Sequence, residues 1–226
     1  MSHVAQIVRP VPAEAPVRRR RIAATLWIFA ERLCATGALI FVLPVLAAAA
    51  ASVWILSGRS PFIAHRRVGQ YGFDFWMLKI RTMWDRSART QPGPRRWIEY
   101  LPDTHVPVFK GSTDPRVTSR LAAWYRRFSI DELPQLLHVA SGRMRLVGPR
   151  PITRAEWNKY YGEASWEALS VPPGITGLWQ IKGRNRLTYA QRRRLDLFYA
   201  RHQSPGLDLR ILLRTPARVL SGRDAC

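Results

Sequence analysis

The chain has 226 residues, 47% of them hydrophobic and 11% aromatic, and its 36 lysines and arginines outweigh 15 acidic residues to give a formal net charge of +21. That much apolar material excludes an acidic disordered tail, a collagen-like repeat and a small disulfide scaffold. Nearly all the basic residues are arginines, whose planar fork suits phosphate and carboxylate oxygens. The charge therefore favours a polyanionic partner: nucleic acid, an anionic membrane surface or a nucleotide sugar.

The two cysteines and five histidines show no pattern of a zinc or other transition-metal site. Cys34 lies in an apolar stretch and Cys226 is the last residue, so we expect no disulfide between them and a reducing compartment.

Residues 1–24 mix proline, alanine and arginine without helical periodicity, which predicts a basic disordered arm. No charged residue then occurs from Leu33 to Leu56, about the length that one helix needs to cross a bilayer. Pro44 lies near the middle of this stretch, so we expect the helix to be kinked or broken there.

Arginines flank the apolar stretch on both sides, which draws both of its ends to the same side of a membrane. A re-entrant helix within residues 25–57 satisfies this tendency, and an ordinary kinked transmembrane helix is an equal alternative on these grounds. A buried helix of a soluble core is the weaker third interpretation.

Residues 58–226 carry charges throughout and predict one α+β domain that is mainly helical, with short strands. An apolar and aromatic segment at 73–83 indicates a strand or a short buried segment, and 87–104, rich in proline, glycine and arginine, indicates a loop. Helical patterns cover 119–140, 153–169, 187–202 and 206–220. The last of these helices is either amphipathic and interfacial or packed on its own domain.

Asp131 and Glu132 are the only two carboxylates adjacent in sequence. On a helix their side chains would point about 100° apart and could reach one ligand from the first turn, which suits a nucleophile beside a metal ligand. The alternative is structural, because Ser129 and Glu132 match the spacing of a helix capping box.

Two segments rich in turn residues carry groups suited to phosphate. Residues 146–151, LVGPRP, hold Arg150 in a proline-stiffened turn, which presents its guanidinium at a low ordering cost. Residues 171–187, VPPGITGLWQIKGRNRL, gather Gln180, Arg184 and Asn185 between glycines. Taken alone, each segment is equally compatible with a surface loop.

A set of strings in chain order resembles the bacterial sugar transferases, also called polyprenyl-phosphate hexose-1-phosphate transferases or monotopic phosphoglycosyl transferases. The strings are RVGQYG, FWMLKIRTM, DPRVTSRL, SIDELPQL, LVGPRP, PPGITGLWQIKGRN, LDLFY and LDLRILL, within residues 61–215. The resemblance implies a proline-broken re-entrant anchor at 25–57 and a small cytoplasmic catalytic domain at 58–226 with interfacial amphipathic helices. It also implies the minimal catalytic form, at the cytoplasmic face of a bacterial inner membrane.

The resemblance further implies transfer of a sugar 1-phosphate from a UDP-sugar to undecaprenyl phosphate, with release of UMP, as the initiating step of exopolysaccharide or related glycoconjugate assembly. By this resemblance Asp131 is the nucleophile that forms a phosphosugar intermediate, and Glu132 holds Mg²⁺. The residues to which it assigns substrate and phosphate binding are Lys79, Arg81, Arg126, Arg150, Gln180, Arg184, Asn185 and Asp196.

The expected partners are a UDP-sugar, undecaprenyl phosphate and membrane lipids, with no nucleic acid. The sequence is compatible with a homodimer and does not decide the oligomeric state. The main rival is a non-enzymatic basic protein that binds anionic lipid or nucleic acid through its arginines and nine tryptophans. A membrane-anchored, inactive scaffold is a third interpretation.

Overall fold

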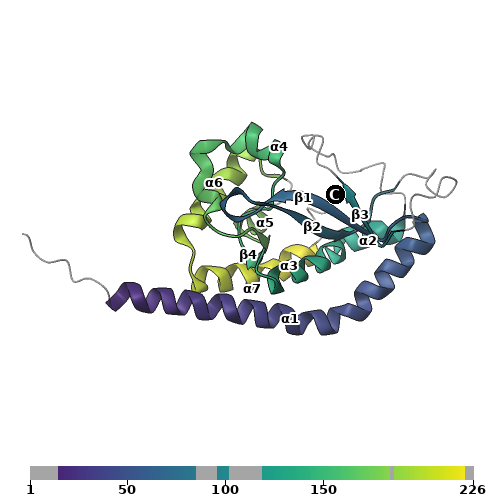
Figure 1. The fold of residues 1–226 in the computed structure, drawn as a ribbon, viewed down its shortest axis with the longest axis horizontal. Coiled ribbons are helices and arrows are strands. Elements are labelled where there is room, and N and C mark those ends of the chain that lie inside the picture. Colours follow the sequence, from purple (N-terminus) through teal and green to yellow (C-terminus); the bar gives the residue numbers. More distant parts are fainter. Residues whose placement is uncertain (1–14, 85–95, 102–118, 184–185, 222–226) are drawn as a thin grey trace, which may run out of the picture.

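The computed structural model describes residues 15–84, 96–101, 119–183 and 186–221. As predicted, it is mainly helical, with a few short strands in a small domain that lies along one long N-terminal helix (Figure 1).

The long helix, α1 (Ala15–Ser57), has 43 residues. Its part from Thr25 to Ser57 is long and apolar enough to cross a membrane, by length and composition. Pro44 lies inside α1, and the helix bends part-way along its length (Figure 1), as expected where a proline removes one backbone hydrogen bond and crowds the preceding turn. The predicted kink is confirmed, and α1 continues through it.

The start of α1 corrects the predicted arm. Residues 15–24 are helical, and only residues 1–14 of the arm lie outside the described residues. Alanine and arginine are strong helix formers, and a proline is tolerated in a first turn. Extending an existing helix also costs less than nucleating one, so the apolar stretch carries the helix back into a segment that lacks its own periodicity.

Three strands form one sheet in the order β2-β1-β3. β1 (Phe62–Val68) pairs antiparallel with β2 (Asp74–Ile80) and parallel with β3 (Ile98–Leu101). β2 confirms the strand expected at 73–83. β3 lies inside the predicted loop at 87–104 and corrects it, because a four-residue strand depends on a distant partner rather than on local composition.

Two of the predicted helical segments are broken into short pieces. Left-handed backbone at Ser129 (φ 56°) and at Gly162 (φ 64°) interrupts them. A continuous α-helix cannot pass through such residues. The pieces are α2 (Arg120–Arg127), η3 (Ile130–Gln135), α3 (Leu136–Ala140), α4 (Arg154–Glu156), the π-helix η4 (Trp157–Tyr161) and η5 (Glu163–Leu169).

The C-terminal helices are close to their predicted ranges: α6 (Tyr189–His202) and α7 (Pro205–Ser221). α7 packs on its own domain through Ile211, while Leu209 and Leu213 on it stay exposed. The remaining elements are η1 (Gln70–Gly72), α5 (Leu178–Lys182) and a parallel pair of short strands, β4 (Arg145–Val147) and β5 (Gly174–Thr176).

A buried group of charged and polar side chains joins α1 to the domain, and we call it the Arg145 cluster. Arg145 pairs with Glu31 of α1 through Nε and Oε2 at 2.8 Å, and with Asp208 of α7 through Nη2 and Oδ2 at 2.9 Å. Trp27 Nε1 and the Tyr199 hydroxyl also donate to Asp208, at 3.1 and 2.7 Å. Because these side chains come from α1, β4, α6 and α7, the cluster holds the long helix in place.

Candidate active site

A polar pocket lies where the sheet, η3 and the loops beside β4 and β5 meet. Lys79, Glu132 and Arg150, predicted from three separate strings, come together there. The residues that line the pocket are Arg67, Met77, Lys79, Glu132, Gln135, Arg150, Pro151, Gly174, Ile175 and Trp179. Three cationic side chains around one carboxylate leave an excess of positive charge, which suits an anion.

The Glu132 carboxylate faces β2 rather than its own helix end. Its Oε1 accepts a hydrogen bond from Lys79 Nζ at 2.8 Å. Ser129 caps η3 without a side-chain hydrogen bond, so the capping-box interpretation is wrong. The left-handed backbone of Ser129 turns the chain between α2 and η3, which puts Glu132 opposite the sheet.

Asp131 precedes Glu132 in the first turn of η3 and is partly exposed. Its side chain is not among those that line the pocket. Pro134 stiffens the same short helix and, with Gln135, is buried. Glu132 thus faces the pocket, while Asp131, the residue before it, is partly exposed and lies outside the pocket lining.

Beside the pocket, the backbones of two glycine-containing loops pack closely against each other. A Cβ on Gly174 would lie 2.1 Å from the backbone nitrogen of Gly148, and a Cβ on Gly177 would lie 2.2 Å from the carbonyl oxygen of Gly148. Only glycine allows this approach. The LVGPRP and PPGITG strings thus form one unit rather than two independent surface loops.

Arg150 stacks on an aromatic wall of the pocket. Its Cζ lies 4.8 Å from the centroid of the Trp179 ring, a cation–π geometry. In the described part of the chain, three buried atoms here have no hydrogen-bond partner: Arg150 Nε, Trp179 Nε1 and Gln180 Oε1. Unsatisfied buried polar atoms are costly, and a ligand in the pocket could supply partners for these three.

Asp196 lies behind the pocket rather than in it. It is buried on α6, where it accepts a hydrogen bond from the Tyr161 hydroxyl at 2.7 Å and one from the backbone N–H of Arg150 at 3.4 Å. Burial raises the pKa of Asp196 from its ordinary 3.8 to about 7, against the opposing effect of those two donors. Asp196 thus holds the backbone of Arg150 and does not reach the substrate space.

His138 supports the other side of the pocket. Its Nε2 accepts a hydrogen bond from the backbone N–H of Leu78 at 3.0 Å, next to Lys79 on β2. Burial, with a smaller effect of Arg143, lowers the pKa of His138 to about 4, so the ring is neutral at pH 7 and can accept this bond.

The other predicted binding residues lie elsewhere. The Arg81 guanidinium donates to the Ser60 carbonyl at 2.8 Å and pairs with Glu99 on β3, so it serves the sheet and not the pocket. Arg126, on α2, is not among the lining residues either. Gln180 is buried on α5 beside Trp179. Arg184 and Asn185 lie outside the described residues.

Seven of the ten lining residues were not among the predicted site residues, and three of the seven carry polar or aromatic groups that a ligand could use: Arg67, Gln135 and Trp179. Arg67 is on β1, a strand that the sequence analysis did not predict, and a period-two reading of 62–68 would have put it on one face with residues 63 and 65. All three were inside recognised strings, Arg67 as the first residue of RVGQYG, and Gln135 and Trp179 lacked a charge that would have singled them out.

The donor set near Glu132 fits Mg²⁺ bound jointly with a substrate. Among the described residues no group of three or more histidine, cysteine, aspartate or glutamate side chains forms a metal cage. Mg²⁺ does not need one, because it is commonly bound by one or two carboxylates together with substrate phosphates and water. Asp131 and Glu132 beside a cationic pocket meet that requirement.

Comparison with known proteins gives consistent matches along most of the chain. A family model described as bacterial sugar transferase matches residues 23–222. The chain is 39% identical over 193 residues to the exopolysaccharide production protein ExoY of Rhizobium meliloti (strain 1021), a match that covers 84% of this chain and 83% of that protein.

Two other relatives are longer than the matched region. Identity is 38% over 194 residues to the UDP-galactose-lipid carrier transferase of Erwinia amylovora, covering 81% of this chain and 39% of that protein. It is 37% over 172 residues to the undecaprenyl-phosphate galactose phosphotransferase of Salmonella typhimurium (strain LT2), covering 74% of this chain and 34% of that protein.

Proposed function

Because the chain belongs to the bacterial sugar transferase family, we propose that it transfers a sugar 1-phosphate from a UDP-sugar to undecaprenyl phosphate and releases UMP. The observation that most supports this is the pocket, where Glu132 and three cationic side chains surround a space suited to phosphate. The names of the Erwinia and Salmonella relatives supply the donor class and the lipid acceptor.

The proposed reaction has two displacements at one phosphorus atom. An oxygen of Asp131 attacks the phosphorus that bears the sugar, a new P–O bond forms, and the P–O bond to UMP breaks. A phosphate oxygen of the lipid acceptor then attacks the same phosphorus, which restores the Asp131 carboxylate and yields a lipid diphosphosugar. A carboxylate suits this role because an acyl phosphate is reactive enough for a weak nucleophile to discharge it.

The cationic residues of the pocket stabilise charge during both steps. Arg150 can offer two parallel hydrogen bonds to phosphate oxygens, and its stacking on Trp179 fixes its plane beforehand. Lys79 contributes a single positive charge next to Glu132. Glu132 would hold Mg²⁺, which when bound offsets the negative charge of the diphosphate.

We further propose that α1 is re-entrant and holds the domain at the cytoplasmic face of the inner membrane. The domain packs along both halves of α1, through Ala35 on one side of Pro44 and through Ala49 and Val53 on the other. A helix that crossed the bilayer from one side to the other would draw one of these contact regions, with its polar neighbours, into hydrocarbon. Entry and exit at one face avoids that cost.

The test is release of UMP by the full chain in nanodiscs, measured with a panel of UDP-sugars and with Mg²⁺ or undecaprenyl phosphate included or omitted. We expect steady release for one donor only when both are present. Absence of release with every donor from folded protein would contradict the proposal and favour the rival, an arginine-rich protein that binds anionic lipid or nucleic acid. That rival predicts binding that weakens steeply with salt.

A further inference from the structure

An apolar groove lies against the C-terminal half of α1. Its volume is about 530 Å³, within the roughly 300–1,000 Å³ typical of ligand sites. All of its lining residues are apolar or aromatic: Leu43, Leu46, Ala47, Ala50, Ala51, Trp54, Ile55, Phe62 and Trp97. A charged or strongly polar group would lose its hydration here without replacement, so the groove suits hydrocarbon.

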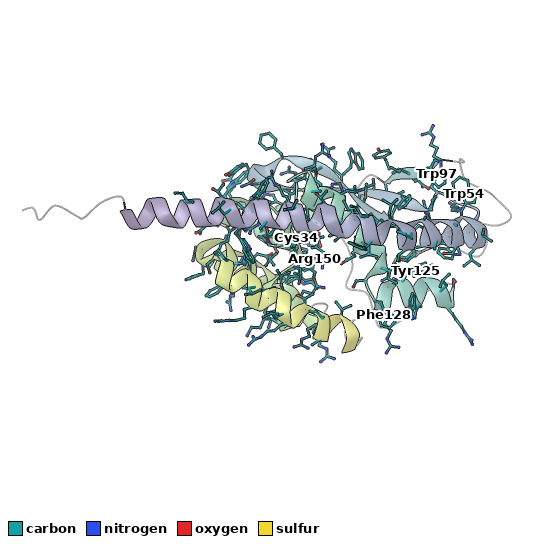
Figure 2. All side chains as sticks on the ribbon, turned by 90° about the horizontal axis from the view of Figure 1, so that it is seen from below. Cys34, Trp54, Trp97, Tyr125, Phe128 and Arg150 are labelled. Atoms are coloured by element: carbon teal, nitrogen blue, oxygen red, sulfur yellow. The ribbon has the colours of Figure 1, made fainter. Side chains whose placement is uncertain are left out.

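Aromatic rings and small residues together make the groove. The rings of Trp54 and Trp97 lie 5.1 Å apart between centroids and are tilted by 51°, and Figure 2 shows both at the C-terminal end of α1. The Phe62 N–H donates to the Trp97 carbonyl at 3.2 Å, which holds that wall against β1. On the helix side, alanines leave the space that larger side chains would fill.

The groove adjoins the carboxylate segment through one hydrophobic cluster. Leu46 and Phe62, which line the groove, pack against this cluster, and so does Ile130, the residue before Asp131. Ile80 is a buried member of the same cluster and follows Lys79 on β2. The groove and the segment that carries Asp131 and Glu132 therefore pack against the same hydrophobic cluster.

We propose that this groove binds the isoprenoid chain of the lipid acceptor while the phosphate of that lipid occupies the polar pocket. This assignment rests on the proposed function. Leu43 and Ile55, at the rim, are 61% and 77% exposed on a helix that is apolar enough for a membrane. A chain from the bilayer can thus enter the groove sideways without passing through water.

The arrangement makes chain length matter. In Figure 2, Arg150 lies nearer the middle of the molecule than Trp54 and Trp97. A long isoprenoid can occupy the groove and still bring its phosphate to Arg150, whereas a short one reaches the pocket with the groove left empty. Filling the groove should therefore impair long acceptors selectively.

Adjacent alanines on α1 allow a matched test. Ala47 and Ala51 line the groove, whereas Ala48 is also exposed on the same helix and does not line it. The full chain in nanodiscs is assayed with undecaprenyl phosphate and with geranyl phosphate, and the ratio of the two kcat/KM values is compared. We expect Ala47→Phe and Ala51→Phe to lower this ratio about tenfold, as overpacking a close-fitting apolar site would, and Ala48→Phe to keep it.

Two outcomes would overturn the assignment: an unchanged ratio in Ala47→Phe and Ala51→Phe, or an equal fall in all three variants, which would point to placement in the bilayer instead. A second measurement does not depend on turnover. A diazirine-bearing polyprenyl phosphate is cross-linked to the wild-type chain, and the label is mapped by mass spectrometry.

We expect label within residues 43–55 or on Trp97, displaced by undecaprenyl phosphate and not by phosphatidylglycerol. Equal displacement by both lipids would overturn the assignment in favour of a site for ordinary acyl chains. Specific labelling without any sugar-phosphate transfer would support lipid binding in the groove and reject the proposed function. Transfer without labelling in the groove would support the proposed function and reject lipid binding there.

Discussion

The polar pocket and the Arg145 cluster are built from the same kinds of residues and are used differently. In the pocket, Lys79 and Glu132 keep 23% and 19% of their side chains exposed. In the cluster, Arg145 and Glu31 each keep 4%, and Asp208 keeps 1%. The first is a surface on which an anion can bind, and the second is a joint between α1 and the domain.

Pairing does not separate the two regions as exposure does, because Glu31 Oε1 and Arg145 Nη1 in the cluster also have no hydrogen-bond partner among the described residues. Asp208 accepts hydrogen bonds from three residues. At the pocket, Arg150 and Trp179 each retain a buried N–H without a partner among the described residues. An unpaired buried group is costly in either region, and only in the pocket is it close enough to solvent for a ligand to reach it. Exposure, more than residue type, separates the two regions.

The largest expected effect separates activity from stability at the carboxylate segment. Asp131→Asn should lower UMP release more than about a thousandfold, the scale on which loss of a covalent nucleophile falls. The melting temperature should stay unchanged, because Asp131 is partly exposed. Asp74→Asn is the matched control, since Asp74 pairs with Arg66 and Arg154 away from the pocket lining. Retention of a tenth of the wild-type rate would exclude the covalent route.

For the Arg145 cluster we expect the substitution to lower stability. Arg145→Met leaves Glu31 and Asp208 buried without their cation and should cost about 3–5 kcal/mol of stability. The exposed pair of Arg201 and Glu167 provides the control, where Arg201→Met should change stability by less than about 1 kcal/mol. Denaturant unfolding in detergent measures both.

A rescue variant sharpens this prediction. Adding Glu31→Gln and Asp208→Asn to Arg145→Met removes the unpaired charges and should recover part of the lost stability. No recovery would mean that the cluster acts through packing and not through charge.

Arg150 tests whether an underpaired arginine at the pocket serves binding. Arg150→Ala should lower kcat/KM by about 10²- to 10³-fold, as loss of an electrostatic contact to a reacting phosphate does. Arg150→Lys should recover only part of it, because lysine lacks the planar fork that stacks on Trp179. Steady-state kinetics with the accepted donor measure the change, and an Arg150→Ala enzyme with wild-type kinetics would remove Arg150 from the site.

The sequence predicted the polar pocket better than the Arg145 cluster, for a physical reason. Glu132 was singled out as one of two adjacent carboxylates and Arg150 by its proline-stiffened turn, while Lys79 was assigned to the site by the resemblance to the sugar transferases. Glu31 and Arg145 are 114 residues apart, and neither periodicity nor local composition marks them as partners. Long-range ion pairs of this kind are decided by tertiary packing.

The strands and helices show the same difference between features with a local sequence pattern and features that depend on distant residues. β2 and α6 carry enough local pattern to be predicted, while β3 and the β4 and β5 pair depend on partners far along the chain. The left-handed backbone of Ser129 could not be predicted from the sequence either, because serine rarely adopts this conformation, whereas a glycine would have suggested it. The interpretation of residues 129 and 132 as a capping box failed for this reason.

Asp196 stands between the two regions, since it is as buried as the Arg145 cluster and supports the pocket through Arg150. Its pKa is raised by burial from 3.8 to about 7, so the folded state favours the protonated form. The stability it contributes is fully present below pH 3.8 and is lost as the pH rises through about 7.

The melting temperature of the wild type should therefore fall between pH 5 and 8 more than that of Asp196→Asn, which stays neutral. Differential scanning fluorimetry of both proteins across this range measures the difference, and parallel curves would show that Asp196 is not the titrating group. A change in kcat/KM of Asp196→Asn smaller than that of Arg150→Ala would confirm that Asp196 acts by positioning Arg150 rather than by touching the substrate.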